Sequence, residues 1–238
     1  MPTLTLKVLE VIQETSDTKS IKLDLTGTNF SYKPGNFVML KLDVQDPRGC
    51  TRAFSVASSP TENFILLTTK ISPSPFKQKF DTLKPGDMVT VNGPFGVFLL
   101  DETKPAVLLG GGIGITPFRC YIKYATDKKL NLKITLLYSN RVPEGIVYKR
   151  EFNNWQKQNQ NFKIINTVTD LQLSKEKEDW KGLIGRIDET MIRKYVLDIN
   201  SAIFYICGPP AMVEAMVNLL KQVNIDSARI KIERFAGY

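Results

Sequence analysis

The stretch LLGGGIGITPFRC, residues 108–120, decides the fold of this chain. Its glycines stand between an apolar run that is typical of a buried strand and a segment that is typical of a helix. Thr116 and Pro117 begin that helix, because proline is well tolerated at the first helical position. Gly112 and Gly114 would let a bulky anion approach the backbone, where the N–H groups of the helix N-terminus attract a pyrophosphate. The stretch therefore predicts the first strand, turn and helix of a doubly wound α/β sheet.

The same glycines also fit a simple tight turn, so this motif alone leaves a nucleotide site and a structural turn as alternatives. Pro117 stands where the standard dinucleotide fingerprint expects a third Gly or Ala. Motifs elsewhere in the chain have to decide between the two.

Downstream of residue 105, apolar strands alternate with helical segments. Strands are expected at 106–110, 133–139, 162–168, 202–208 and 228–235, and helices at 116–127, 148–158, 188–196 and 209–223. Strands that are apolar throughout and alternate with helices predict a parallel sheet, here of five strands, covered on both faces.

The first hundred residues have a different pattern. Six short runs rich in β-branched and aromatic residues are expected to be strands, at 4–12, 20–25, 37–42, 52–58, 64–70 and 88–93. KPGN at 33–36 and KPGD at 84–87 fit type II turns, with proline and glycine at the two central positions. We expect a six-stranded antiparallel β-barrel, followed near DETKP by a change of domain, so that residues 1–101 and 102–238 form two domains.

Composition excludes several classes of chemistry. The 238 residues include no histidine, which removes Ser–His catalysis and histidine-bound zinc or haem. Cys50, Cys120 and Cys207 are too few for a four-cysteine iron–sulfur cluster and show no disulfide spacing, and we expect no metal site. No apolar run approaches the roughly 20 residues of a membrane span, and the N-terminus lacks the features of a signal peptide, so we expect a cytoplasmic protein.

The net charge is +8, from 32 Lys and Arg against 24 Asp and Glu. The charge is compatible with solubility alone, and also with a face that docks an acidic macromolecule. Nucleic acid is the less favoured partner, because the basic residues are spread along the chain without a basic block.

Two further motifs accompany the glycine stretch. In TRAFSVASSP, residues 51–60, a strand would place Arg52 and Phe54 on one face and Ser55 on the other. In YICGPPAMV, residues 205–213, an apolar strand turns directly into a helix. Taken singly, the first could be an ordinary barrel strand and the second a helix start with an inert buried cysteine.

Together and in this order, the three motifs resemble those of the ferredoxin–NADP reductase family, and NGPFGVF and the terminal KIERF fit as well. The resemblance covers essentially the whole chain. It implies an antiparallel flavin-binding barrel followed by a nicotinamide-binding α/β domain. It also implies FAD, with FMN as the alternative, and NADPH or NADH as cofactors.

The resemblance assigns the flavin site residue by residue. Arg52 would pair with a flavin phosphate, Phe54 would pack on the flavin in place of the more usual tyrosine, and Ser55 would lie near flavin N5. Ser74 and Pro75 would begin a helix at the pyrophosphate, where many members have a glycine-rich turn. The flavin-binding set implied by the resemblance is Arg52, Ala53, Phe54, Ser55, Val56, Ala57, Ser58, Thr69, Lys70, Ser74, Phe76, Lys77 and Phe235.

The resemblance also assigns the nicotinamide side. Cys207 would lie beside the nicotinamide ring, and Glu233 would lie near the contact of the two rings, so that Ser55, Cys207 and Glu233 are the expected catalytic residues. Phe235 would cover a flavin face, and the tail Ala236-Gly237-Tyr238 has no assigned role. The nucleotide-binding set is Gly111, Gly112, Ile113, Gly114, Thr116, Pro117, Asn140, Arg141, Cys207, Gly208, Pro209 and Met212.

These assignments predict an oxidoreductase that moves hydride from NAD(P)H to FAD and then passes electrons to a separate acceptor. An acidic ferredoxin or flavodoxin would suit the basic chain. Arg141, at the end of the second strand of the nucleotide domain, favours NADPH, because a basic residue there can hold the 2′-phosphate. The alternatives are an NAD(P)H:flavin reductase and a non-catalytic electron-transfer subunit of a larger complex.

Overall fold

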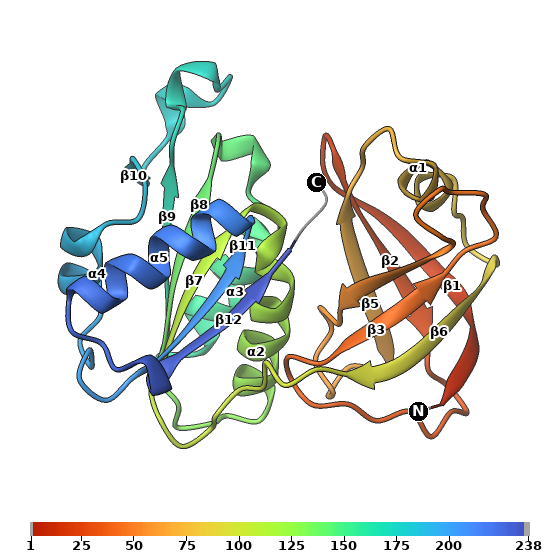
Figure 1. Ribbon diagram of the computed structural model, residues 1–238, viewed down its shortest axis with the longest axis horizontal. Coiled ribbons are helices and arrows are strands. Elements are labelled where there is room, and N and C mark those ends of the chain that lie inside the picture. Colours follow the sequence, from red (N-terminus) through yellow and green to blue (C-terminus); the bar gives the residue numbers. More distant parts are fainter. Residues whose placement is uncertain (1, 236–238) are drawn as a thin grey trace.

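The computed structural model describes residues 2–235 and consists of two halves that lie side by side (Figure 1). The N-terminal half is built from β-strands, and the C-terminal half is a parallel sheet with helices on both faces. Helix α2 lies on the side of the parallel sheet that faces the barrel. Within residues 2–235, the helices lack the length and apolar character that crossing a bilayer requires.

Six antiparallel strands form the N-terminal half, as the sequence predicts. Their order is β4-β3-β6-β1-β2-β5. The two end strands approach one another where the N–H of Ala57, just beyond β4, donates to the Leu66 carbonyl in β5 at 2.9 Å. The strands are β1 (Thr3–Thr15), β2 (Thr18–Asp24), β3 (Phe37–Lys41), β4 (Thr51–Ser55), β5 (Phe64–Lys70) and β6 (Met88–Phe95).

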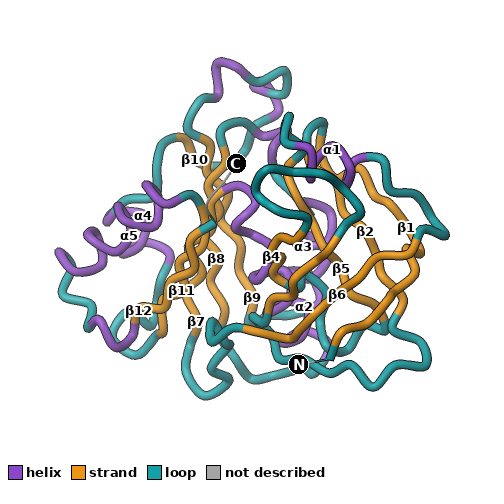
Figure 2. The backbone as a smooth tube through the Cα atoms, turned by 45° about the vertical axis from the view of Figure 1, so that its right-hand side comes forward, coloured by secondary structure: helices purple, strands orange, loops and turns teal. Residues whose placement is uncertain are grey.

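Helix α1 (Pro75–Asp81) lies at one end of the barrel (Figure 2). Ser74 caps it by accepting the Lys77 N–H, and Pro75 is the first helical residue, so the expected helix start is confirmed. Its Phe76 and Phe80 side chains are fully buried in the barrel core. The helix is therefore fixed to the barrel by two aromatic rings.

Both predicted turns have type II geometry. In KPGN, the Asn36 N–H donates to the Lys33 carbonyl at 3.0 Å, and Gly35 has a φ of +99°. In KPGD, the Asp87 N–H donates to the Lys84 carbonyl at 3.1 Å, and Gly86 has a φ of +97°.

The C-terminal half is a parallel sheet in the order β10-β9-β8-β7-β11-β12. Five of its strands are those expected from the sequence. The sixth, β10, is a two-residue edge strand that is too short to leave a periodic signal. The strands are β7 (Ala106–Gly111), β8 (Ile134–Asn140), β9 (Phe162–Val168), β10 (Leu183–Ile184), β11 (Ile203–Gly208) and β12 (Ile230–Arg234).

Helices cover both faces of this sheet. They are α2 (Thr116–Asp127), α3 (Lys149–Gln158), α4 (Glu189–Tyr195) and α5 (Pro210–Gln222). Leu108 packs with residues of α2 and α3, whereas its neighbour Leu109 packs with residues of α4 and α5. This alternation explains why the strands are apolar throughout. Short 3₁₀ turns lie at Gly112–Ile115, Pro143–Gly145, Leu171–Leu173, Lys177–Asp179 and Ser227–Arg229.

The two halves share an apolar core. The cluster beneath α2 and α3 includes Ala57, Leu66 and Phe98, which come from the barrel or the loop that follows it. The Tyr121 hydroxyl of α2 also donates a hydrogen bond to the Phe98 carbonyl. The halves are therefore packed together as one body through buried contacts.

The two turn glycines provide a test of this packing. Both have a positive φ, which costs a residue with a Cβ about 1–2 kcal/mol. A Cβ on Gly86 would meet no atom of the described residues within 4 Å, whereas one on Gly35 would overlap the Phe98 carbonyl oxygen at 1.8 Å. We expect Gly86→Ala to lower the free energy of unfolding by about 1–2 kcal/mol, and Gly35→Ala to lower it by about 3 kcal/mol or more, as measured by urea denaturation. Equal losses in the two variants would contradict the close approach at Gly35.

Candidate functional site

A cavity of about 260 Å³, called the central cavity below, lies between the barrel and the parallel sheet. One wall is β4 and β5 of the barrel, and the other is the glycine turn and the end of β12. Eleven residues that the sequence assigns to the two cofactors line it: Arg52, Ala53, Phe54, Ser55, Thr69, Ser74, Lys77, Ile113, Thr116, Glu233 and Phe235. The flavin motif and the C-terminal strand, far apart in sequence, thus meet in one place.

Ser55 and Glu233 join the two walls of this cavity. The Ser55 hydroxyl donates to the Glu233 carboxylate across 3.5 Å, a long hydrogen bond. Burial raises the pKa of Glu233 from 4.5 to about 7, although the hydrogen bond from Ser55 acts in the opposite direction. Glu233 can therefore hold or release a proton near neutral pH.

Arg52 is held from several sides at the end of the cavity. Its Nη1 donates to the carbonyls of Arg48, Gly49 and Thr51 at 3.0, 2.6 and 2.8 Å. Its Nη2 lies 2.9 Å from a carboxylate oxygen of Asp46. The other oxygen of Asp46 accepts the Phe76 N–H at the start of α1. Asp46, which the sequence did not single out, thus places a carboxylate between Arg52 and the start of α1.

Lys77 brings a second cationic side chain to this end of the cavity. Burial, together with the positive charges of Arg52 and Arg48, lowers the pKa of Lys77 to about 8. Its amine donates to the Thr69 hydroxyl. Crowded, partly desolvated positive charge of this kind favours an anion such as a phosphate.

A second cavity, of about 640 Å³, also borders the glycine turn. It is lined by eight of the assigned residues: Lys70, Gly111, Gly112, Ile113, Asn140, Arg141, Pro209 and Met212. Gly112 has a φ of +52°, and a Cβ there would meet no described atom within 4 Å, so its backbone faces open space. The turn can therefore be approached by a ligand from this cavity, as the sequence predicts for a pyrophosphate.

Polar groups at the end of β8 face the same cavity. The Asn140 side chain is buried beside Tyr138, and within residues 2–235 its Nδ2 has no partner with hydrogen-bond geometry. Arg141 is 73% exposed and lies 3.5 Å from Asp170. Arg186, from the loop after β10, lines the cavity as well and carried no motif that could have revealed it.

Several assigned residues do not reach either cavity. Val56, Ala57 and Ser58 are fully buried, Val56 in the barrel core and Ala57 in the apolar cluster that the two halves share. The Val56 N–H donates to the Asn36 carbonyl, and the Ala57 N–H donates to the Leu66 carbonyl. These two amides are therefore already bonded within the protein, and the assignment of Val56, Ala57 and Ser58 to the flavin-binding set stays a prediction.

The two aromatic residues of the flavin-binding set that lie beside α1 differ in their place at the cavity. Phe54 borders the cavity but is 6% exposed, and its ring stacks on that of Phe80 with the centroids 5.7 Å apart. Phe76 is fully buried in the barrel core and does not border the cavity, so its side chain cannot contact a ligand there. Phe76 therefore helps to fix α1 on the barrel, whereas the packing of Phe54 on a flavin stays a prediction.

On the nucleotide side, Gly114 and Cys207 are packed against other parts of the protein. A Cβ on Gly114 would lie 2.4 Å from the Cys207 carbonyl oxygen, so this glycine allows close packing of the turn on β11. Cys207 is fully buried, and burial followed by the nearby charge of Glu233 raises the pKa of its thiol. Gly208 and Pro117 border neither cavity, and the Gly208 carbonyl accepts the Phe235 N–H at 3.1 Å.

Positions 236–238, which have no assigned role, lie outside the described residues. Within residues 2–235, no group of three or more Cys, Asp or Glu side chains is arranged to hold a metal ion.

Comparison with known proteins identifies both halves. Residues 5–99 match the oxidoreductase FAD-binding domain, and residues 108–218 match the oxidoreductase NAD-binding domain. The chain belongs to the ferredoxin–NADP reductase-like flavoprotein oxidoreductases. The resemblance stated from the motifs is thereby confirmed.

Similar members of this oxidoreductase family include the F subunit of the Na⁺-translocating NADH-quinone reductase. The Idiomarina loihiensis protein is 31% identical over 202 residues, and the Yersinia pestis protein is 32% identical over 203 residues. Each alignment covers 78% of this chain and 49% of the relative. The chain thus spans about half the length of the curated relatives it matches.

Solved structures give the same fold. The Amycolatopsis cytochrome P450 reductase GcoB superposes with a TM-score of 0.83 at 26% identity, covering 98% of this chain and 70% of that one. A ferredoxin NADP⁺ reductase from Neisseria gonorrhoeae with bound FAD and NADP superposes with a TM-score of 0.82 at 20% identity, covering 98% and 99%. At that lower identity the likeness concerns the fold alone.

The cavities fit the cofactors of the family. Arg52 and Lys77 gather positive charge beside the start of α1, as a flavin phosphate requires. The open backbone at Gly112 and the buried amide nitrogen of Asn140 offer donors to a dinucleotide. These residues would hold FAD and NAD(P)H in the two cavities that border the glycine turn.

The raised pKa of Glu233 predicts how stability depends on pH. Below pH 4.5 the carboxyl is protonated in both the folded and the unfolded chain, whereas between 4.5 and about 7 only the unfolded chain ionises. We therefore expect Glu233 to make the free energy of unfolding fall as pH rises through that window, with no further change above it. Urea denaturation of the cofactor-free protein and of Glu233→Gln, which cannot ionise, measures the difference. Identical pH profiles for the two proteins would contradict the raised pKa.

Proposed function

We propose that this oxidoreductase transfers hydride from NADH or NADPH to FAD, and then passes the electrons to a redox centre outside the chain. One observation carries the proposal. Ser55 of the flavin half and Glu233 of the nucleotide half meet in a cavity that the glycine turn also borders. A flavin and a nicotinamide bound to their own halves would come together there.

When bound, FAD supplies the two-electron acceptor and the nicotinamide supplies the hydride. The protein has to orient the two rings and exclude water. Ile113 and Thr116 close the cavity on the nucleotide side, and Phe235 closes it beside β12. Ser55 would donate a hydrogen bond at the flavin, and Glu233, with its pKa of about 7, would exchange the proton that accompanies electron release.

The cofactor-binding roles follow from the two cavities. Arg52, Ser74 and Lys77 would hold the flavin phosphates, and residues 1–101 would form the FAD domain. Gly111, Gly112 and Asn140 would hold the dinucleotide, and residues 102–238 would form the NAD(P) domain. Cys207 would act indirectly, by packing beside Glu233 on the neighbouring strand, because its thiol is fully buried.

For the acceptor, the relatives favour an assembly. The F subunit of the Idiomarina loihiensis NADH-quinone reductase is 31% identical to this chain, and the aligned segment covers 49% of it. We propose on this basis that the chain works as the NAD(P)H-oxidising unit of a larger electron-transfer complex.

A separate ferredoxin or flavodoxin is the second candidate acceptor, and the net charge of +8 favours it. Attraction to an acidic carrier would weaken as salt screens charges beyond a Debye length of about 8 Å. Activity with such a carrier that falls steeply with salt supports the second candidate, whereas flat activity supports the assembly.

The hydride step gives the direct test. We expect the purified protein to bind FAD, and NAD(P)H to bleach the flavin absorbance in anaerobic stopped-flow experiments. Ser55→Ala and Glu233→Gln should each slow reduction roughly tenfold or more at saturating nucleotide, since both lie where the rings would meet. Ser31→Ala, an exposed serine of the same half, is the control and should leave the rate unchanged. A protein that binds no flavin, or wild-type rates in both site variants, would contradict the proposal.

Arg141 gives the test of nucleotide preference. Its exposed guanidinium at the cavity is available to a 2′-phosphate, because within residues 2–235 it forms one long ion pair, with Asp170 at 3.5 Å. We expect Arg141→Ala to raise the KM for NADPH about tenfold or more and to leave NADH kinetics nearly unchanged, because a charged hydrogen bond contributes roughly 1.5–3 kcal/mol. Arg193→Ala, which removes an exposed helical ion pair, is the matched control. Equal losses for both nucleotides would show that Arg141 does not bind the phosphate.

A further inference from the structure

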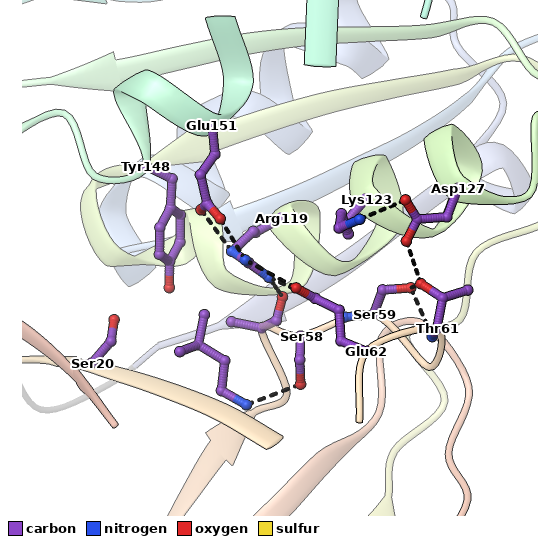
Figure 3. Close-up of polar contacts among 12 residues, drawn as sticks. Ser20, Ser58, Ser59, Thr61, Glu62, Arg119, Lys123, Asp127, Tyr148 and Glu151 are labelled. Atoms are coloured by element: carbon purple, nitrogen blue, oxygen red, sulfur yellow. Dashed lines mark hydrogen bonds and ion pairs between the residues drawn. The ribbon is translucent and has the colours of Figure 1, made fainter. Parts of the chain in front are cut away.

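Arg119 is buried at the interface and contacts both halves of the molecule. Its side chain is 3% exposed, and it stands on α2 three residues after Thr116, which borders the central cavity. Figure 3 shows its guanidinium between Glu62 from the barrel side and Glu151 from α3. In the sequence, Arg119 is a charged residue among the apolar residues that begin a predicted helix, and this pattern could have drawn attention to it.

The guanidinium makes direct hydrogen bonds in both directions. Toward the barrel, Nη1 donates to the Ala57 carbonyl at 2.9 Å and to Glu62 at 3.1 Å. Toward its own half, Nε and Nη2 donate to the two carboxylate oxygens of Glu151 at 2.8 and 2.6 Å. A planar fork suits this arrangement, and the single ammonium of a lysine cannot reproduce it.

The surroundings hold the side chain in its position. The guanidinium carbon lies 5.3 Å from the ring centres of Tyr148 and Trp155. Burial alone would lower the pKa of Arg119, but the hydrogen bond and charge of Glu151 and the charge of Glu62 raise it overall. The side chain therefore remains charged and bound to both partners.

The segments that Arg119 joins both border the central cavity. Ala57 follows β4 by two residues, and β4 ends at Ser55 in the cavity wall. Glu62 is fixed in turn by the Ser59 N–H, which donates to its carboxylate at 2.8 Å. On the other side, α2 carries Arg119 and begins at Thr116 in the opposite wall. One side chain thus connects the two walls, through the segment that follows β4 and through α2.

We propose that Arg119 is a positioning residue that sets the separation of the Ser55 wall and the Thr116 wall, and with it the alignment of nicotinamide and flavin. The inference rests on the proposed function. Its physical basis is that hydride transfer is steeply sensitive to geometry, so that a misplacement of about 1 Å can cost a hundredfold in rate. The residue borders neither of the two cavities that would hold the cofactors, and it acts through Ala57 and α2.

Arg119→Lys is the decisive variant, because it keeps a charge but loses the fork. Rapid-reaction measurements give three quantities: the limiting rate of flavin reduction per bound flavin, the Kd of FAD and the Kd of the nucleotide. We expect the limiting rate to fall about tenfold or more, with both Kd values within about threefold of wild type. Glu151→Gln should give a smaller fall in the limiting rate, since one carboxylate oxygen can still accept. Arg193→Gln, on the exposed helix α4, is the control and should match wild type.

A second measurement requires no cofactor. Amide hydrogen exchange of the cofactor-free protein reports whether residues 57–62 loosen when the fork is lost. We expect faster exchange at these amides in Arg119→Lys and not in Arg193→Gln. An Arg119→Lys protein whose limiting rate lies within about twofold of wild type overturns the inference, whatever its amide exchange. A lower activity explained wholly by lost flavin would also overturn it, because that outcome marks a purely structural role.

The two proposals fail in different ways. If the wild-type protein binds FAD but NAD(P)H does not reduce it, the proposed function is wrong. If the wild type is reduced and Arg119→Lys is reduced equally fast, only the role of Arg119 is wrong.

Discussion

The register of the parallel sheet is the constraint on which the site depends. Gly110, Cys207 and Glu233 are direct neighbours across β7, β11 and β12. Because parallel strands end at a common edge, a single alignment brings the glycine turn and the Glu233 carboxylate of the central cavity to the same level. Gly114 lets the turn lie against the backbone of β11 at a distance that a residue with a Cβ would not allow. The apolar strands thus determine where the polar groups meet.

Much of this arrangement could be predicted from the sequence. Strand alternation and apolar periodicity indicated both sheets, and the Pro-Gly pairs indicated the two type II turns, because each signal is local. The motifs also indicated many of the residues that line the two cavities, including Ser55 and Glu233, although 178 positions separate these two. Motifs succeed over such distances only because a known family supplies the topology that joins them.

Other features could not be predicted, because they depend on what packs against the segment. Val56 and Ala57 continue the flavin motif in sequence, but in space Val56 lies in the barrel core and Ala57 lies in the interface beneath α2. Phe76 follows the helix cap at Ser74, yet its ring lies in the barrel core. The pairing of Arg119 with carboxylates on two different halves is set by tertiary contacts alone. Periodicity states which face of an element is apolar, and it does not state which partner covers that face.

The turn at Gly35 has a consequence for modularity. This barrel turn lies under the Phe98 carbonyl and the Tyr121 hydroxyl of α2, with no room for even a methyl group. The barrel and the α/β half have therefore been shaped against one another at the level of single atoms. If one half of this chain is joined to the complementary half of a relative, we expect a well-packed chimera only when Gly35, Phe98 and Tyr121 are kept together.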